Sequence, residues 1–261
     1  MKARRAALVL ALAVTGCGVQ RAALFPAPLY PRTPELAGAT LVQKTARPGV
    51  EIVALHVPAP AGRPTIVFFH GNGQQLADVT PLLGAFARAR LGVYAVEYPG
   101  YGLCPGEPEE RTVIDAADAA LDHLHDGLGV PPRSVVLLGQ SLGTGVATEM
   151  AVRRHGVGLA LISPYTSVDE LARHYFPLPT ALTVDDHFDT LAKAPTLAMP
   201  VLIVNGTKDG LIPPRMSLEL AAAFPDAAVA WVPGGHHNDL FVRAGRDIIA
   251  TVVTFSEIAT Q

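Results

Sequence analysis

The stretch Val135-Val136-Leu137-Leu138-Gly139-Gln140-Ser141-Leu142-Gly143 decides the fold of this chain. Its four leading aliphatic residues predict a short strand that is buried on both faces. Residues 144–154, which are compatible with a helix, follow at once. A serine in a sharp turn between such a strand and a helix needs small residues two positions before and after it, so that the helix can approach the strand. Gly139 and Gly143 meet this need, and the pattern predicts that Ser141 is a nucleophile at the carboxyl end of a strand.

Other short apolar runs alternate with longer helical patterns along the chain. We expect strands at residues 49–57, 65–69, 92–97, 134–138, 158–162, 200–204 and 227–232. This alternation indicates an α/β fold with a mostly parallel central sheet and helices on both faces. Ligands of such sheets bind beyond the carboxyl ends of the strands, so the residues after each strand are the place to look for chemistry.

Two later residues complete a set that can activate a serine. A serine hydroxyl needs a base to take its proton, and the base needs an acid that holds its tautomer. Asp209 stands in a turn after the expected strand 200–204, and His237 stands after the last expected strand. Taken singly, Asp209 could cap a turn or helix and His237 could be a loop histidine. Together, in the order Ser, Asp, His, they predict a catalytic triad with Asp209 as acid and His237 as base.

The oxyanion that forms when Ser141 attacks a carbonyl needs preorganised N–H donors. The backbone amide of Leu142, directly after the serine, is one candidate. The loop 70–73 after the expected strand 65–69 supplies another, for which we choose the amide of Asn72, with Gly71 letting the backbone come close. The alternative is that this glycine-rich loop is only a tight turn.

Six motifs in order carry a resemblance to a known family. They lie at residues 69–73, 97–102 with 105–108, 139–143, 186–189, 206–213 and 237–240. From about residue 50 to the C-terminus the chain resembles the Bem46-like, ABHD12/13/17-type serine hydrolases of the α/β-hydrolase fold. The resemblance implies that fold with at most a small lid, a triad of Ser141, Asp209 and His237, an oxyanion hole of Asn72 and Leu142, and an ester, thioester or lipid substrate.

The same resemblance chooses between two adjacent histidines, because it places His237 on the catalytic position and His236 on a site usually held by glycine. Two positions depart from the family pattern. Gly73-Gln74 replaces the usual pair of small residues, and Cys104 stands where the pattern has serine. We interpret Cys104 as a small, partly buried side chain rather than a second nucleophile.

Composition limits the partners and the architecture. The chain has 261 residues, of which 49% are hydrophobic and 16% charged, with a formal net charge of -3. These values favour one domain with a substantial core and give no sign of a nucleic-acid partner. No cluster has the spacing of metal ligands, and we expect no metal and no cofactor. The oligomeric state is left open.

The N-terminus predicts export and attachment to a membrane. Residues 1–16 combine a positive start with a short apolar stretch, as in a signal peptide, and Val14-Thr15-Gly16-Cys17 resembles a bacterial lipobox. We expect lipidation of Cys17, a proline-rich tether at residues 17–48 and the hydrolase domain at residues 49–261. The expected location is the bacterial cell envelope, with the outer membrane favoured because Gly18 follows Cys17. The alternative is an ordinary secretory signal with an incidental cysteine.

Residues 163–198 form the longest stretch between late strands, and their aromatic and aliphatic side chains are consistent with a small lid that favours acyl substrates. We expect Asp186 and Asp189 to cap or anchor this segment. The leading function is a metal-independent hydrolase of esters or thioesters that forms an acyl-serine intermediate. An amidase or peptidase with the same triad is the second reading. A catalytically silent envelope lipoprotein that uses the fold for binding is the third.

Overall fold

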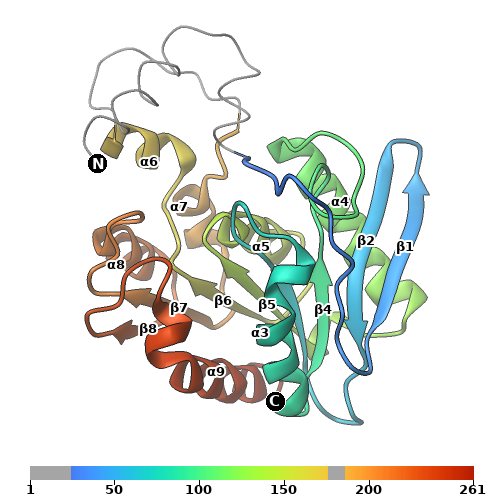
Figure 1. The fold of residues 1–261 in the computed structure, drawn as a ribbon. Coiled ribbons are helices and arrows are strands. Elements are labelled where there is room, and N and C mark those ends of the chain that lie inside the picture. The colour runs from blue at the N-terminus through green and yellow to red at the C-terminus, as the bar shows by residue number, and fades with distance from the viewer. Residues whose placement is uncertain (1–24, 176–185) are drawn as a thin grey trace, which may run out of the picture.

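The sheet of this protein has the strand order β1-β2-β4-β3-β5-β6-β7-β8. The computed structural model describes residues 25–175 and 186–261, and Figure 1 shows these elements along the chain. The strands are β1 (Thr40–Arg47), β2 (Val50–Val57), β3 (Thr65–Phe69), β4 (Gly92–Val96), β5 (Val135–Gln140), β6 (Gly158–Ile162), β7 (Val201–Gly206) and β8 (Ala227–Val232). The α-helices are α3 (Leu76–Arg88), α4 (Glu110–Asp122), α5 (Leu142–Val152), α6 (Val168–Tyr175), α7 (Thr190–Lys193), α8 (Pro214–Ala223) and α9 (Leu240–Ala259). Three short helical turns are η1 (His123–Gly127), η2 (Pro132–Ser134) and η3 (Ala194–Thr196).

Six of the strands, from β4 to β8 in the sheet order, run parallel to their neighbours. β2 pairs antiparallel with β4, and β1 pairs antiparallel with β2. Every residue of β3, β6 and β7 is buried. Because both faces of these strands are covered, their sequences are continuous apolar runs rather than alternating patterns. The expected α/β fold with a mostly parallel sheet is confirmed.

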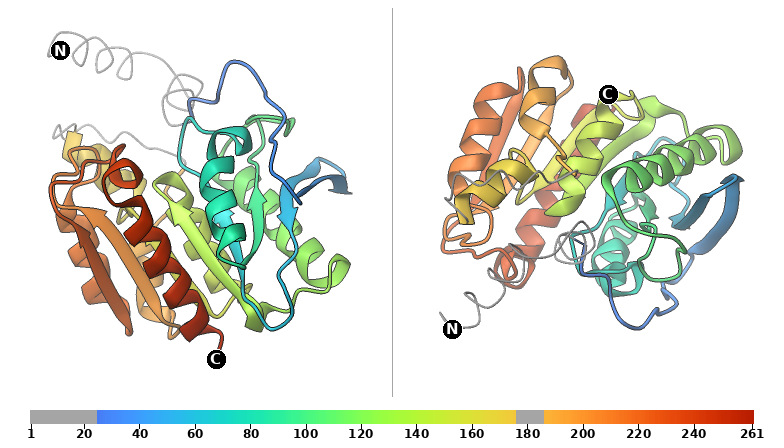
Figure 2. Two further views of the ribbon diagram at one scale, coloured as in Figure 1. Left: turned by 60° about the horizontal axis from the view of Figure 1, so that its bottom comes forward. Right: turned by 90° about the horizontal axis from the view of Figure 1, so that it is seen from above.

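Helices cover the two faces of the sheet in separate groups (Figure 2). On one face, α3 and α9 pack with Ile66 and Phe68 of β3 in one hydrophobic cluster. On the other face, α4, α5 and α8 pack with Val67 and Phe69 of the same strand in a second cluster. Successive residues of a strand point to opposite faces, so a single five-residue strand supplies both cores.

The N-terminal part of the domain differs from the expected tether at residues 17–48. Phe25 is buried and its ring packs edge-on against that of Phe188, with centroids 6.3 Å apart. Residues 40–47 form β1, whose side chains are mostly exposed. With so few apolar side chains to bury, β1 has no apolar run and gives a weak sequence signal. The sequence Pro48-Gly49 could have indicated a turn between two strands, because Gly49 has φ 78° in the turn from β1 to β2.

The expected signal peptide and Cys17 lie outside the described residues. In the part of the chain that the structure describes, no helix has the length and apolar character needed to cross a bilayer. The carboxyl ends of the six parallel strands all lie at one edge of the sheet, which we call the site edge. The site edge is uppermost in Figure 1, where α6 lies, and the chain ends at the opposite edge.

Candidate active site

Ser141 occupies a strained turn between β5 and α5. Its φ of 51° and ψ of -118° lie in a region that residues with a side chain rarely adopt. A Cβ on Gly139 would lie 2.3 Å from the carbonyl oxygen of Gly143, and a Cβ on Gly143 would lie 2.1 Å from that of Phe69. Both glycines are therefore required for the close approach of the helix to β5 and β3. The Ser141 amide donates to the Ile162 carbonyl at 2.9 Å, which fixes the turn to β6.

The structure brings Ser141, Asp209 and His237 into hydrogen-bond contact. His237 Nε2 lies 3.0 Å from Ser141 Oγ, and His237 Nδ1 lies 2.8 Å from Asp209 Oδ2. A carboxylate only accepts hydrogen bonds, so Nδ1 carries the proton that it donates to Asp209. Nε2 is then left as the acceptor that faces the serine hydroxyl. These are the three residues that the sequence predicted. They lie after the carboxyl ends of β5, β7 and β8.

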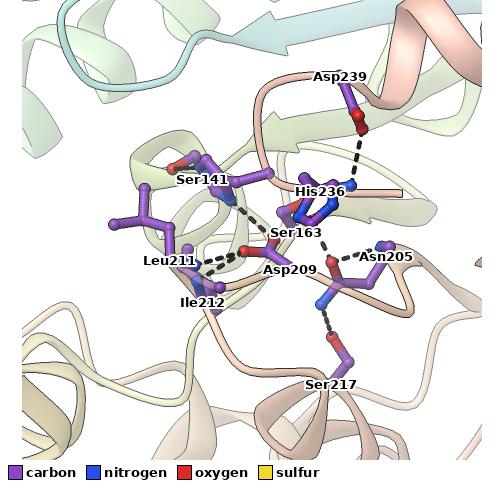
Figure 3. Close-up of polar contacts among 12 residues, drawn as sticks. Ser141, Ser163, Asn205, Asp209, Leu211, Ile212, Ser217, His236 and Asp239 are labelled. Atoms are coloured by element: carbon purple, nitrogen blue, oxygen red, sulfur yellow. Dashed lines mark hydrogen bonds and ion pairs between the residues drawn. The ribbon is translucent and has the colours of Figure 1, made fainter. Parts of the chain in front are cut away.

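The Asp209 carboxylate is held by the turn in which it stands. Its Oδ1 accepts from the amides of Leu211 at 2.9 Å and Ile212 at 2.8 Å (Figure 3). Its Oδ2 faces His237. Burial raises the pKa of Asp209, but the hydrogen bond and charge of His237 and the two backbone amides outweigh it and lower the pKa overall. Asp209 therefore stays ionised and can stabilise a positive charge on the imidazole.

The sequence analysis missed a buried polar cluster of Asn205, Ser163 and Ser217. Asn205, at the end of β7, donates from Nδ2 to Ser217 Oγ at 2.8 Å and accepts at Oδ1 from the Gly206 amide at 2.7 Å. Its Oδ1 also accepts from Ser163 Oγ at 3.2 Å. The cluster links the ends of β6 and β7 to α8. The only available signal was a polar residue directly after the apolar run 201–204.

The two adjacent histidines have different environments. The side chain of His237 is 10% exposed and bonded at both nitrogens, as described above. His236 is exposed, and its backbone amide donates to Asp239 Oδ1 at 2.7 Å. Asp239 in turn pairs with Arg243 at 2.7 Å, so the turn before α9 is fixed by its own polar contacts. The structure thus places His237, and not His236, between Ser141 and Asp209.

The loop 70–75 lies against the Ser141 turn. A Cβ on Gly71 would lie 3.4 Å from the Cβ of Ser141, and Asn72 is the next residue along the loop. Asn72 Oδ1 accepts a hydrogen bond from the Tyr101 hydroxyl at 2.7 Å. Leu142 is the first residue of α5, and an amide at that position has no acceptor within its own helix. Leu142 therefore adjoins the serine, and Asn72 follows a residue that lies against it.

The side chains of His70, the first residue of this loop, and Glu97 form a buried hydrogen-bonded pair, and the sequence analysis did not single out either side chain. Glu97 follows β4, and its Oε2 accepts from the Leu76 amide at 2.9 Å, at the start of α3. The Tyr98 hydroxyl donates to the His70 carbonyl at 2.8 Å. A Cβ on Gly102 would lie 2.2 Å from Glu97 Oε2, which explains a glycine there. The motif at residues 97–102 thus supports the loop 70–75.

The remaining predicted residues have structural contacts. Asp189 Oδ1 caps α7 by accepting from the Ala192 amide at 2.9 Å, and Asp186 Oδ1 accepts from the Glu110 amide. Burial, followed by the charges of Glu97 and Glu51, raises the pKa of Cys104 to about 12. The thiol is therefore protonated at neutral pH and a poor nucleophile. Across residues 25–175 and 186–261, no three His, Cys, Asp or Glu side chains gather in a group that could hold a metal ion.

The fold and the strained serine turn define the class of protein, and comparison with known proteins agrees. Residues 66–197 match the Alpha/beta hydrolase family. The chain belongs to this family.

Three relatives have the same sequence identity to this chain. The chain is 32% identical to the uncharacterized protein Rv2307c of Mycobacterium tuberculosis, over 84% of this chain and 79% of that protein. It is 32% identical to aho-3 of Caenorhabditis elegans over 72% of this chain, and to human alpha/beta hydrolase domain-containing protein 17C over 70%. The match spans only 56% of aho-3 and 55% of the human protein.

Solved structures share the fold at lower identity. The Pyrococcus furiosus esterase Pf2001 superposes with a TM-score of 0.70 at 14% identity, over 89% of this chain and all of that chain. A monoacylglycerol lipase from Paleococcus ferrophilus superposes with a TM-score of 0.63 at 21% identity, over 80% of this chain and all of that chain. The structural neighbours named here are thus an esterase and a lipase.

Proposed function

We propose that this protein is a serine hydrolase that cleaves an ester or thioester of an acyl or lipid-like substrate. The observation that carries the proposal is the chain of hydrogen bonds from Asp209 through His237 to Ser141, which stands in a strained turn at the end of β5. A hydroxyl, an imidazole and an ionised carboxylate in this order are the parts that nucleophilic acyl transfer needs. The esterase and lipase among the structural neighbours favour an ester.

The geometry supports a two-stage reaction. Ser141 Oγ attacks the substrate carbonyl carbon while His237 Nε2 takes the hydroxyl proton, and the carbonyl electrons move to its oxygen. The amides of Leu142 and Asn72 stabilise that oxyanion, and Asp209 stabilises the imidazolium. The carbon–oxygen or carbon–sulfur bond then breaks, and His237 protonates the leaving alcohol or thiol. Water, deprotonated by His237, releases the acid and regenerates the serine.

Within the family, we propose membership of the Bem46-like, ABHD12/13/17-type group. The similarity to alpha/beta hydrolase domain-containing protein 17C supports this assignment. Residues 97–102, one of the motifs that carry the resemblance, also contact the loop 70–75 and the residue after it. Tyr98 bonds to His70, Tyr101 to Asn72 and Glu97 to the Leu76 amide.

The chemistry is tested with an activity probe and a matched pair of substrates. A fluorophosphonate should add covalently to the parent chain and not to Ser141→Ala, as read by intact mass. A p-nitrophenyl ester and the p-nitroanilide of the same acyl group distinguish an esterase from an amidase. Absence of labelling together with absence of ester hydrolysis would refute the proposal and leave a binding role. Faster cleavage of the anilide would replace esterase by amidase.

We also propose that Cys17 carries a lipid and attaches the chain to the bacterial envelope, with the outer membrane favoured. The support is the order of charged, apolar and small residues before Cys17. Cys17→Ser should abolish incorporation of radiolabelled palmitate and leave the precursor unprocessed. Processing at the same site in that variant would contradict the lipid anchor.

A further inference from the structure

Exposed apolar side chains lie around the site edge on several segments. We define the rim patch as the large apolar residues that are exposed beside the site. They are Leu29 (89% exposed), Tyr30 (79%), Tyr175 (40%), Leu211 (46%) and Val242 (87%). Burying such side chains is favourable, so a group of them beside an active site can form a surface that meets a partner.

Leu29 and Tyr30 are held beside the loop 70–75. The Tyr30 carbonyl accepts from Gln75 Nε2 at 3.2 Å, and the Arg32 amide donates to Gln75 Oε1 at 2.8 Å. Arg32 also pairs with Asp78 in the first turn of α3. Pro28 and Pro31 flank the two residues and restrict the backbone. The two apolar side chains are thus presented to solvent by a segment pinned next to Asn72.

The other rim residues border the remaining parts of the site. Leu211 follows Asp209 by two positions and donates its amide to that carboxylate at 2.9 Å. The Tyr175 hydroxyl donates to the Leu211 carbonyl at 2.6 Å, which joins the end of α6 to the same turn. Val242 is in the first turn of α9, which begins three residues after His237. The rim residues therefore lie on or beside the segments that follow β3, β6, β7 and β8.

The opposite edge of the sheet offers an internal comparison. Ile258 is 63% exposed near the end of α9. Its neighbour Ala259 lies beside Gly158, where a Cβ would come within 2.8 Å of the Ala259 Cβ. Gly158 is the first residue of β6, so Ile258 lies at the amino end of the parallel strands, away from the site. It is an exposed apolar residue in a location that has no relation to Ser141.

From these contacts we infer that the rim patch docks on a lipid bilayer, so that the mouth of the site faces the membrane. The length of chain before Phe25 favours this partner. Residues 18–24 separate Cys17 from Phe25, and a fully extended chain of this length spans at most about 30 Å. A lipid on Cys17 would therefore hold Phe25, four residues before Leu29, within about 30 Å of the bilayer. A tyrosine beside a leucine also suits the boundary between headgroups and acyl chains.

The proposed lipid on Cys17 is what makes a bilayer the expected partner of the rim patch, so this inference rests on the proposed function. The test removes the lipid and measures binding by the rim patch alone. Residues 17–261 with Cys17→Ser retain every described residue and carry no lipid. Ser141→Ala is added so that binding is measured without hydrolysis. Flotation with vesicles of phosphatidylethanolamine and phosphatidylglycerol gives the bound fraction as a function of lipid concentration.

We expect residues 17–261 with Cys17→Ser and Ser141→Ala to bind the vesicles. Adding Leu29→Asp and Tyr30→Asp together should weaken the apparent affinity at least about tenfold, because two apolar contacts are replaced by charges. Ile258→Asp should change it by less than about twofold. With Ser141 restored, all variants should hydrolyse a soluble short ester at the parent rate, which shows that they are folded.

Three outcomes would overturn the inference. The first is that the unlipidated protein does not bind vesicles, and the second is that the variant with Leu29→Asp and Tyr30→Asp binds as tightly as the parent. The third is that Ile258→Asp weakens binding as much as that double variant does. A dimer that the Leu29/Tyr30 substitutions dissociate, seen by sedimentation without vesicle binding, would assign the rim patch to a second copy of the chain instead. Failure of ester hydrolysis with vesicle binding intact would count against the proposed function alone.

Discussion

His70 Nε2 lies 2.8 Å from Glu97 Oε1, and both side chains are almost completely removed from solvent. His70 Nδ1 lies 2.9 Å from the carbonyl oxygen of Gly71, which can only accept, so Nδ1 is protonated. A second proton lies between Nε2 and the Glu97 carboxyl group. The pair thus connects the end of β4 to the loop that carries Asn72.

Glu97→Ala should reduce kcat for a soluble ester by about 10²-fold or more, because the loop that carries Asn72, the proposed oxyanion donor, loses its support. KM should change by less than about threefold, and the inhibition constant of a trifluoromethyl ketone should rise in parallel with the loss of kcat. Glu97→Gln should recover most of the activity. Its amide can donate to Nε2 of a neutral His70, and its oxygen can still accept from the Leu76 amide. Equal losses in both variants, or a loss in KM alone, would contradict a positioning role.

Replacing the two adjacent histidines should separate a base from a surface residue. We expect His237→Ala to lower kcat by several orders of magnitude, because Ser141 then has no base. His236→Ala should lower it by about tenfold at most. Steady-state kinetics of both purified variants on one activated ester decide the point. A severe loss in His236→Ala with a mild loss in His237→Ala would reverse the assignment.

Ser141→Gly should stabilise the protein while it abolishes hydrolysis. A side chain held at a φ of 51° costs on the order of 1–3 kcal/mol, and glycine relieves that strain at some cost in chain entropy. The expected net gain in the free energy of unfolding is about 1 kcal/mol. Ser141→Ala keeps a Cβ and is the matched control, with little gain expected. Urea unfolding of the three proteins measures the difference, and equal stabilities would show that the turn carries no strain.

The ionisation of Asp209 should appear in the pH dependence of stability. Its pKa is lowered in the folded protein, so the ionised carboxylate stabilises the fold at any pH above the unfolded value of about 3.9. This contribution is lost as the pH falls through the folded pKa. The stability difference between the parent and Asp209→Asn should therefore shrink as the pH falls from about 5 to about 2. Urea midpoints across this range test it, and a difference that grows in acid would have the wrong sign.

Cys104 should be inert to thiol reagents in the folded protein. With Cys17→Ser it is the only cysteine left, and its pKa of about 12 keeps the thiol protonated at pH 7. Iodoacetamide should label it only after denaturation, as read by intact mass. Cys104→Ala should hydrolyse esters at the parent rate. Rapid labelling with loss of activity would make Cys104 part of the site.

The sequence predicted those parts of the fold and site whose causes are local. Residues 65–69 and 158–162 were expected strands and coincide with β3 and β6, because a strand covered on both faces must be apolar throughout. Residues 227–232 coincide with β8, whose sequence is an apolar run although most of its residues are only partly buried. The strained serine turn could be predicted since only glycine fits beside it. β1 could not be predicted, because its mostly exposed side chains form no apolar run and it is held in place by pairing with β2. The partnership of His70 with Glu97 depends on the adjacency of β3 and β4, which are separated by a helix in the chain.

The position of α9 has a practical consequence for handling this protein. Its last residues pack beside Gly158, at the edge of the sheet opposite Ser141, and the chain ends there. An affinity tag or surface coupling placed after Gln261 would leave the mouth of the site directed away from a solid support. Immobilisation through the N-terminal segment would instead press the same mouth against the matrix. The end chosen for coupling would thus determine whether large substrates reach the serine.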